Sequence, residues 1–378
     1  IMADSMDKKY SNVPNLRFSN VDDWKVIKLS EYADFLQGLT YHPENVKHSG
    51  TLVLRSSNIQ NGKLDFNDCV YVDMVIPKRI STRKNDVLMC VRNGSKALVG
   101  KTAIIDDQNE NHAWGAFMSV LRPKDNSTFL FHYLNSKYFT NQIKADLNTA
   151  TVNQITFGML NHCNISIPLN QIEKNKICDL LDKINLRIDT QNKIISAKKS
   201  LMKNIVVGMK NDSTSSIALS SIAEIYQPQT LAQNELIPGD YYVYGANGII
   251  GKHNRYNHEN EEICLTCRGS TCGNLCLSKP FSWINGNAMV IKTNNNINKH
   301  FIYYALLKIN WSKYISGSGQ PQIVRSAIQN IRINLPDIEI QNKISIVLDT
   351  LNDSIEAELL LLNKLNELKR YLLSNLFI

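Results

Sequence analysis

The sequence contains no apolar run approaching the roughly 18 residues that a membrane-spanning helix needs. It also lacks the charged-then-apolar opening of a secretory signal, so we expect a cytoplasmic protein without membrane association. The ten prolines are never adjacent, which excludes the Asn/Asp-Pro-Pro-aromatic tetrapeptide of amino-methyltransferases. Neither G-x-x-x-x-G-K-S/T nor H-E-x-x-H occurs. These absences argue against a self-contained ATPase, zinc protease or base methyltransferase.

The composition is typical of a folded protein with more than one domain. Of the 378 residues, 43% are apolar and 20% are charged, which suffices for hydrophobic cores. The length predicts about two to four folding units. The net charge of +8 permits a polyanionic partner without establishing one. We interpret the segment IMADS before Met6 as extraneous to the fold, and residues 1–12 as a flexible N-terminus.

Eight cysteines are too few for a disulfide scaffold in a chain of this length, and we expect reduced thiols. Four of them fall in CLTCRGSTCGNLC (264–276). Their spacing suggests a four-thiolate zinc site, although four ligands in so short a segment would crowd the metal. The alternative is a β-hairpin in which ICLTC and NLCLS are strands around the turn RGST, with cysteines buried as small apolar residues. We favour the hairpin and expect no bound metal.

The chain repeats itself. Residues 175–189 (NKICDLLDKINLRID) align with residues 342–356 (NKISIVLDTLNDSIE) at an offset of 167. Upstream, Gln154-Ile155 matches Gln322-Ile323 at an offset of 168, and each half contains a basic-Gly-Ser turn, VRNGSK in the first and CRGST in the second. We therefore predict two copies of one plan, each a variable globular part followed by a more similar helical part.

Two segments show the heptad pattern of long helices. In residues 171–210 apolar residues recur in steps of four and three, and polar Gln191 and Lys198 occupy the missed positions. The seam residues are Ile177, Leu181, Ile184, Ile188, Ile195, Met202 and Ile205, followed in residues 337–378 by Ile344, Leu348, Leu351, Ile355, Leu362, Leu365 and Leu372. The pattern predicts a coiled coil. The alternative is two amphipathic helices that pack on separate globular cores.

Charge predicts how the two helices pair. Residues 187–210 hold six basic side chains and one acidic, whereas residues 337–358 hold six acidic side chains and one basic. Only an antiparallel pair places the basic end of the first helix beside the acidic start of the second, and such charges set orientation more than stability. We therefore expect an antiparallel pair with a globular part at each end, related by an internal pseudo-twofold repeat.

Several motifs resemble one known family, the DNA-specificity (S) subunits of type I restriction-modification systems. IPLNQIEKNKI (167–177) and NLPDIEIQNKI (334–344) are similar to the family's I-P-L-P-x-x-E-Q-x-x-I entry to each conserved helix. SGSGQPQIVRSAIQNIRINLP (316–336) resembles the segment that closes a target recognition domain, and VPNLRFSNVDDWKVIKLSEY (13–32) resembles the common opening. The first domain departs from this pattern, because ATVNQITFGMLNHCNISIP (150–168) lacks the Gly-Ser-Gly of the second.

The resemblance implies an α/β (α+β) fold with two similar target recognition domains, residues 13–170 and 211–336, separated by the antiparallel coiled-coil helices at 171–210 and 337–378. Each domain would read one half of a bipartite site in double-stranded DNA. Two methyltransferase (M) subunits would dock on the helices, and restriction (R) subunits would join the complex. The chain would not be an enzyme by itself. No cofactor is expected in this chain, since S-adenosylmethionine, ATP and magnesium would belong to the partner subunits.

Two other functions stay open at this point. One is the recognition part of a composite DNA methyltransferase-nuclease, although the two repeats take up nearly all of these residues and leave no room for a methyltransferase region. The other is a scaffold that binds only proteins, which would lack salt-sensitive binding to duplex DNA.

We predict DNA contacts at polar turns that follow strand-like runs. Arginine offers a bidentate fork for guanine, and asparagine or glutamine suits adenine, whereas lysine, serine and backbone amides hold phosphates. The alternative at each position is an ordinary solvated turn. In the first half the candidates are Arg55, Ser56, Asn58, Lys78, Arg79, Arg92, Asn93, Ser95, Lys96 and Lys101. In the second half they are Tyr244, Asn247, Lys252, Arg255, Tyr256, Arg268, Ser270, Thr271, Ser318, Gln320 and Gln322.

Overall fold

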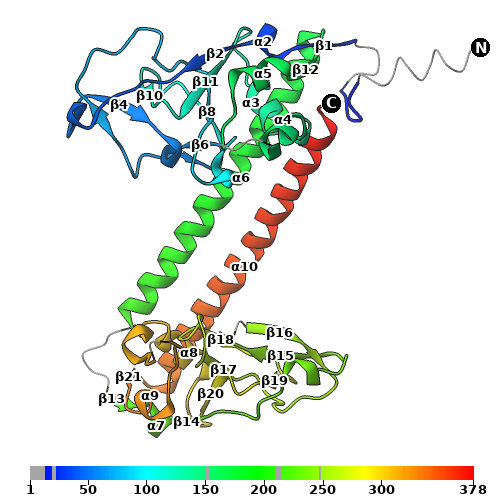
Figure 1. The fold of residues 1–378 in the computed structure, drawn as a ribbon. Coiled ribbons are helices and arrows are strands. Elements are labelled where there is room, and N and C mark those ends of the chain that lie inside the picture. Colours follow the sequence, from blue (N-terminus) through cyan, green and yellow to red (C-terminus); the bar gives the residue numbers. More distant parts are fainter. Residues whose placement is uncertain (1–12, 19–22, 150–152, 210–214, 247, 318) are drawn as a thin grey trace, which may run out of the picture. The chain divides into compact units, whose positions relative to one another are not determined.

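The structure, a computed structural model, describes residues 13–18, 23–149, 153–209, 215–246, 248–317 and 319–378 (Figure 1). The chain divides into two compact units. Unit 1 comprises residues 1–190 together with 362–378, and unit 2 comprises residues 191–361. The segment 1–12, predicted to be flexible, lies outside the described residues.

Unit 1 combines short strands with short helices. Its strands are β1 (Trp24–Lys28), β2 (Ala33–Gln37), β3 (Val46–Lys47), β4 (Thr51–Leu54), β5 (Ile59–Gln60), β6 (Lys63–Leu64), β7 (Tyr71–Val72), β8 (Val87–Cys90), β9 (Thr102–Ile104), β10 (Ala113–Trp114), β11 (Met118–Pro123) and β12 (Asn164–Pro168). Its helices are α2 (Leu29–Tyr32), α3 (Phe129–Leu134), α4 (Lys137–Thr149) and α5 (Phe157–His162), with 3-10 turns at Pro43–Asn45, Ser56–Asn58 and Lys96–Leu98.

Two four-stranded sheets form the body of unit 1. One is antiparallel with the order β2-β11-β8-β9, and the other has the order β10-β4-β7-β3 with β10 parallel to β4. All four residues of β8 (VLMC) are buried, which explains why this strand reads as a continuous apolar run. Helix α3 (FLFHYL) is buried along its whole length and belongs to the same core as β8.

Unit 2 repeats this plan. Its strands are β13 (Ser215–Ala218), β14 (Ala223–Tyr226), β15 (Tyr241–Gly245), β16 (Gly248–His253), β17 (Ile263–Thr266), β18 (Leu275–Leu277), β19 (Trp283–Ile284), β20 (Ala288–Thr293) and β21 (Arg332–Leu335). Its short helices are α7 (Leu219–Ile222), α8 (Lys299–Leu306) and α9 (Arg325–Ile328), with 3-10 turns at Gln233–Glu235 and Trp311–Tyr314.

Two sheets of unit 2 have the same strand order as their counterparts in unit 1, and a third is shorter by one strand. The order β14-β20-β17-β18 corresponds to β2-β11-β8-β9, and the pair β13-β21 corresponds to β1-β12. The sheet β16-β15-β19 again contains a parallel pair, β15 with β19. The predicted internal repeat is therefore confirmed at the level of topology.

Two 38-residue helices, α6 (Gln171–Gly208) and α10 (Ile338–Asn375), carry the predicted heptads. Asn170 caps α6, because its Oδ1 accepts a hydrogen bond from the main-chain N–H of Ile172 at 2.8 Å. Helix α6 ends at Gly208, the first glycine after its start, and Pro336 lies just before α10.

Within each unit the two helices pack antiparallel. In unit 1 the start of α6 lies against the end of α10, where Ile177, Leu181 and Ile184 share a core with Leu372 and Leu376. In unit 2 the opposite ends meet, and Val206 of α6 packs with Leu348 of α10. The antiparallel coiled coil is confirmed, and the seam residues of α6 in unit 1 also join the globular core.

The polar residues in the heptad seam form a cluster in unit 2. Gln191, only 2% exposed, donates its side-chain amide to the main-chain carbonyl of Glu358 at 3.0 Å. The Lys198 ammonium donates to a Glu358 carboxylate oxygen at 2.7 Å and to Ser354 Oγ at 2.6 Å. Satisfied polar groups at such positions fix the register of a helix pair.

Equivalent histidines attach each globular part to a long helix. His132 of α3 hydrogen-bonds to Asp182 of α6 at 2.8 Å, and His300 of α8 hydrogen-bonds to Asp349 of α10 at 2.8 Å. Burial lowers the pKa of His132 despite its carboxylate partner. The hydrogen bond to Glu261, also 2.8 Å, acts with that to Asp349 against burial and raises the pKa of His300 to about 9.

The cysteine-rich segment forms the expected hairpin. Strands β17 and β18 pair antiparallel, with Cys264 directly opposite Cys276. The hydrogen bond with Cys276, together with burial, raises the pKa of the Cys264 thiol, which favours the protonated form over a thiolate ligand. Among the described residues no cluster of His, Cys, Asp and Glu has the arrangement of a metal site. No helix in the described ranges is long and apolar enough to cross a membrane.

Candidate nucleic-acid interface

The basic turns predicted to contact DNA hold the same backbone position in both units. Arg92 pairs with Gln154 in an isolated antiparallel bridge, and Arg268 pairs with Gln322 in the same way. The neighbouring bonds also correspond: Ile155 N–H donates to the carbonyl of residue 91 at 2.8 Å, and Ile323 N–H donates to that of residue 267 at 3.0 Å. The two matches found in the sequence, the basic turn and the Gln-Ile pair, are thus neighbours in space.

A parallel strand pair completes this arrangement of backbone hydrogen bonds, which we call the backbone frame. At the end of β10 the N–H of Gly115 donates to the carbonyl of Leu54 at 3.0 Å, and at the end of β19 the N–H of Asn285 donates to that of Tyr244 at 2.8 Å. A tight turn follows each bond, and the Arg92 N–H closes the frame in unit 1 by donating to Phe117 O at 3.1 Å. In each unit, therefore, separate loops converge on one edge.

Polar and aromatic side chains meet at this edge of unit 1. The Asn93 side-chain amide donates to Ser56 Oγ at 3.2 Å, which joins two predicted turns that lie far apart in the sequence. The Arg92 guanidinium lies over the ring of Phe117, 5.2 Å from its centroid. Arg55 forms an ion pair with Asp68 at 2.8 Å.

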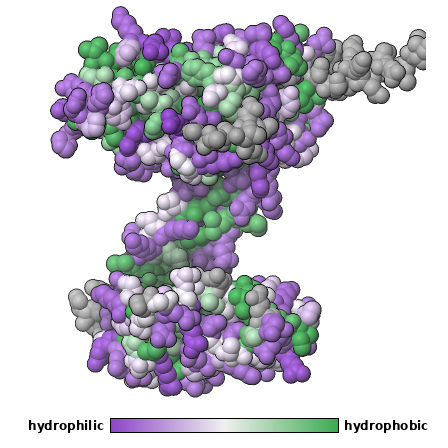
Figure 2. All heavy atoms as spheres, viewed as in Figure 1, coloured by the Kyte–Doolittle hydropathy of each residue, from purple (hydrophilic) through white to green (hydrophobic). Residues whose placement is uncertain are grey.

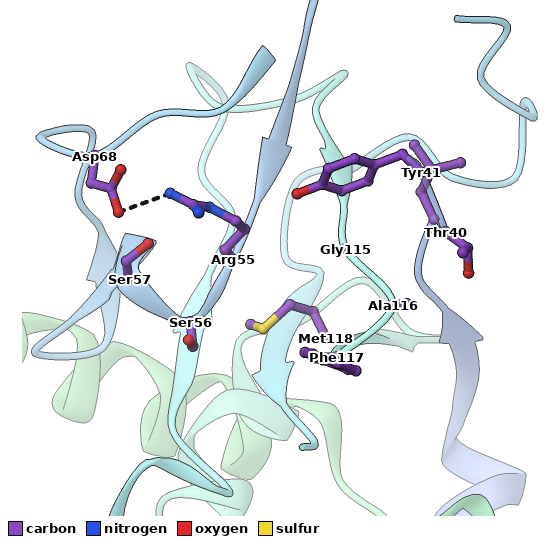
Figure 3. A pocket seen from close by; sticks show the side chains of 11 residues that line it. Thr40, Tyr41, Arg55, Ser56, Ser57, Asp68, Gly115, Ala116, Phe117 and Met118 are labelled. Carbon is purple, nitrogen blue, oxygen red and sulfur yellow. Dashed lines mark ion pairs between the residues drawn. The ribbon is translucent and has the colours of Figure 1, made fainter. Parts of the chain in front are cut away.

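An open cleft of about 590 Å³ lies in unit 1 beside these turns. Figure 3 shows Tyr41 and Arg55 on opposite sides of the cleft, with Met118 and Phe117 between them and the Arg55 guanidinium turned toward Asp68. Its lining residues are Leu39, Thr40, Tyr41, Arg55, Ser56, Ser57, Asp68, Gly115, Ala116, Phe117 and Met118.

Some predicted residues of unit 1 have structural roles instead. Asn58 is fully buried, and its amide donates to the carbonyls of Asp65 and Asp68, both at 2.9 Å, so it stabilises the loop and is not exposed to DNA. The Lys101 ammonium donates to Ile59 O at 3.0 Å. Ser95 and Lys96 are exposed in the basic turn.

Lys78 and Arg79 are exposed on the loop between β7 and β8. This loop is tied to the segment just before β10, because the N–H of Thr82 donates to His112 O at 2.9 Å.

Three predicted segments of unit 2 come together around Arg268. The Gly269 N–H donates to Pro321 O at 3.0 Å, and the Thr271 hydroxyl donates to Ala246 O. Arg268, Ser270, Gln320 and Gln322 are exposed there. The candidates Asn247 and Ser318 lie outside the described residues.

The remaining candidates of unit 2 divide into a buried residue and a second cluster. Tyr244 is 4% exposed, and its hydroxyl accepts a hydrogen bond from Lys279 N–H at 3.0 Å, so its side chain belongs to the core and is not available to DNA. Lys252 lies over the Tyr242 ring at 5.2 Å. Tyr256 packs edge-on against its aromatic neighbours, and Arg255 is exposed beside it.

Tyr41 and Phe117 are two residues of this site that were not predicted from the sequence. An aromatic residue that follows an apolar stretch such as AWGA is ordinarily a core residue, yet Phe117 is 59% exposed. Its exposure follows from the tight turn after β10, which no single-residue pattern reveals.

The comparison with known proteins decides the family. The family defined by the type I restriction modification DNA specificity domain matches residues 21–198 and again residues 212–369. The chain belongs to this family. The two matches of the specificity domain coincide with the two halves of the repeat, and the resemblance stated from the motifs is confirmed.

Individual relatives of this specificity-domain chain are also known. It is 30% identical over 176 residues to the EcoKI type I restriction enzyme specificity subunit of Escherichia coli K12. The matched segment covers 45% of this chain but only 38% of that relative. Its fold resembles that of the type I S subunit from M. genitalium, with a TM-score of 0.72 and 19% identity, covering 97% of this chain and 99% of the other. A structure from a study of type I R-M complex assembly gives a TM-score of 0.51 at 15% identity, covering 93% and 96%.

Proposed function

We propose that the chain is the DNA-specificity subunit of a type I restriction-modification complex and that it binds a bipartite double-stranded target. Unit 1 reads one half-site and unit 2 reads the other. The observation that carries this proposal is the repeated frame in which Arg92-Gln154 and Arg268-Gln322 hold equivalent backbone positions. A duplicated frame with different side chains around it suits two different short sequences.

The exposed side chains around the two frames fall into base-contacting and phosphate-contacting groups. Arg92 and Arg268 project from turns, where a guanidinium can donate to guanine O6 and N7 in the major groove. The nearby Ser95, Lys96 and Ser270 are exposed and suit phosphate oxygens, which fix the register of the protein on DNA. The net charge of +8 favours a polyanionic partner.

The long helices provide the docking surface for methyltransferase subunits. They expose large apolar side chains that their own pairing does not cover, and Figure 2 shows apolar patches along them. In α6 these include Leu186, Leu201 and Val207, and in α10 Ile346, Val347 and Leu360. Exposed apolar patches of this kind mark protein interfaces. We assign two M subunits to this surface, and R subunits to the assembled complex.

The chemistry belongs to those partners. S-adenosylmethionine would serve the M subunits, and ATP with magnesium the R subunits, in a complex where this chain is non-catalytic. The test uses duplexes from the host genome and the purified chain with and without its M partner. We expect no methylation by the chain alone in S-adenosylmethionine, ATP and magnesium, and site-specific methylation once M is added.

Two results would contradict the proposal. Methylation by rigorously purified chain alone would make it an enzyme. A lack of binding to duplex DNA, or binding that does not weaken as salt rises, would instead favour the protein-only scaffold. Phosphate contacts release counterions, so true DNA affinity depends steeply on salt.

A further inference from the structure

The cleft of unit 1 has the shape of a site for a small planar ligand. Its volume of about 590 Å³ lies within the range of roughly 300 to 1,000 Å³ typical of small-molecule sites. Tyr41 stands on one side, and the Phe117 ring contributes aromatic surface below, next to the buried Met118 (Figure 3). Phe117 is 59% exposed, so its ring offers accessible aromatic surface next to the Arg92 guanidinium, which lies 5.2 Å from the ring centroid.

Polar groups with unused hydrogen-bonding capacity line the same cleft. Arg55 Nε and Ser57 Oγ are buried atoms without a hydrogen-bond partner in the described structure, although another Arg55 nitrogen pairs with Asp68 at 2.8 Å. Unsatisfied buried donors are costly, so an arriving polar edge that accepts their hydrogen bonds would be stabilised. The cleft therefore offers aromatic faces together with donors at one side.

A nucleobase combines the features that this lining requires. It has two apolar faces that stack on aromatic rings and an edge of hydrogen-bonding atoms. A base pair stacked inside a duplex presents only its groove edges, which do not fill a concave site. We propose that the cleft of unit 1 binds a single nucleobase. This inference rests on the proposed function, because the expected source of the base is the DNA target, from which it would be unstacked into the cleft.

The equivalent place in unit 2 is built differently. Asn285 holds the backbone position of Gly115, as the matching bonds after β10 and β19 show. Its amide donates to Leu231 O at 2.6 Å, and its Oδ1 accepts from Leu231 N–H at 3.3 Å. This pair of bonds holds the segment after β14 against the turn that follows β19, so the inference applies to unit 1.

A mismatch scan of the target tests the proposal in the complex with M subunits. An enzyme or binding protein that extrudes a base gains affinity when that base is already unpaired, since the cost of unpairing is removed. We expect a mismatch at one position of one half-site to tighten binding by about tenfold or more, which corresponds to about 1.4 kcal/mol. Mismatches elsewhere in the target should leave binding unchanged or weaken it.

Two matched variants assign the effect to the cleft. Phe117→Ala should abolish the gain from the mismatch, because it removes the stacking surface, and its exposed position makes the substitution compatible with folding. Phe66→Ala removes another exposed phenylalanine of unit 1 that does not line the cleft, and it should retain the full gain. An equal gain in the wild type and in Phe117→Ala would overturn the assignment.

A second arm distinguishes the two possible sources of the base. Titration calorimetry with each of the four deoxynucleoside monophosphates should detect binding lost in Phe117→Ala if a free nucleotide occupies the cleft. A mismatch gain without this binding identifies a DNA base. If neither the mismatch gain nor the nucleotide binding is observed, the proposal is overturned. Failure of the proposed function is separate, because the wild type would then show no preference for the matched target over a scrambled duplex.

Discussion

Gln191 donates its side-chain amide to the main-chain carbonyl of Glu358 at 3.0 Å, and the two residues are 167 positions apart, the same offset that relates the two repeats. Repeat-equivalent residues thus face each other where the helices cross in unit 2. The Gln191 amide also donates to the Glu358 carboxylate, and a slip of one heptad would place a leucine there and remove this side-chain acceptor, so the buried pair fixes the antiparallel register.

Removal of the Gln191 amide should destabilise the helix pair. Gln191→Ala leaves polar groups of the cluster without a partner and opens a gap at a buried position, so we expect a loss of about 1 to 3 kcal/mol in the free energy of unfolding. Denaturant unfolding measures it. The exposed neighbour provides the control, and Asn192→Ala should change stability by less than about 0.5 kcal/mol. Equal effects of both variants would show that the polar cluster does not stabilise the pair.

High pH should loosen the attachment of α8 to α10. The raised pKa of His300, about 9, means that its charged form is favoured by the fold over the unfolded chain. Its contribution is therefore fully present below about pH 6.5, the ordinary histidine value, and is lost as the pH rises through 9. Hydrogen exchange in α8 should accelerate between pH 7 and 10 more in the wild type than in His300→Gln, after correction for intrinsic exchange.

The equivalent histidine of unit 1 is the control for this pH effect. Burial lowers the pKa of His132, so it does not change charge between pH 7 and 10. The difference in corrected hydrogen-exchange rate of α3 between the wild type and His132→Gln should stay constant from pH 7 to pH 10. If protection from hydrogen exchange fell equally with pH in α3 and in α8, the role assigned to the Glu261 hydrogen bond would be contradicted.

Arg92 and Arg268 should each affect one half-site. If Arg268 reads a guanine, Arg268→Ala should cost roughly 1 to 3 kcal/mol and relax base preference in one half of the target only. Arg92→Ala should do the same in the other half, so each variant controls for the other. Selection of bound sequences from a random duplex library measures both preferences. A uniform loss across all sequences, with a shallower salt slope, would make the arginine a phosphate contact.

Lengthening the helices should widen the gap between the half-sites. Because Gln191 faces Glu358, an insertion after Ser196 is matched across the pair by one after Asn352. Seven residues at each place keep the apolar seam in phase and add about 10.5 Å of helix. This corresponds to roughly three base pairs if the helices run along the DNA axis. Mapping of methylated sites should show the same half-sites with a wider gap, and an active variant with the original gap would refute this.

The long-range features of the fold were predictable because they depend on periodicity. The heptad of Ile177 and Leu181 identifies a seam whatever the rest of the chain does, and the charge difference between the helices sets their direction. The Arg92 and Arg268 turns were also found, since repetition marks them.

The details of the candidate site were less accessible. The cleft gathers Tyr41, Arg55 and Phe117 from three loops, and no sequence pattern links residues whose proximity depends on strand pairing. Asn58 looked like an exposed turn residue, yet it caps its own loop from a buried position. Polar residues in turns read alike in sequence whether their amides bind the backbone or a ligand.

In the proposed function, this chain chooses the DNA sequence that its complex modifies. The most direct measurement maps methylated bases across the host genome with the gene present, with the gene deleted, and with the deletion complemented by Arg268→Ala. We expect a bipartite motif with a fixed gap that disappears on deletion and returns in the complemented strain with one half-site relaxed. A methylation pattern that is identical in all three strains would contradict it.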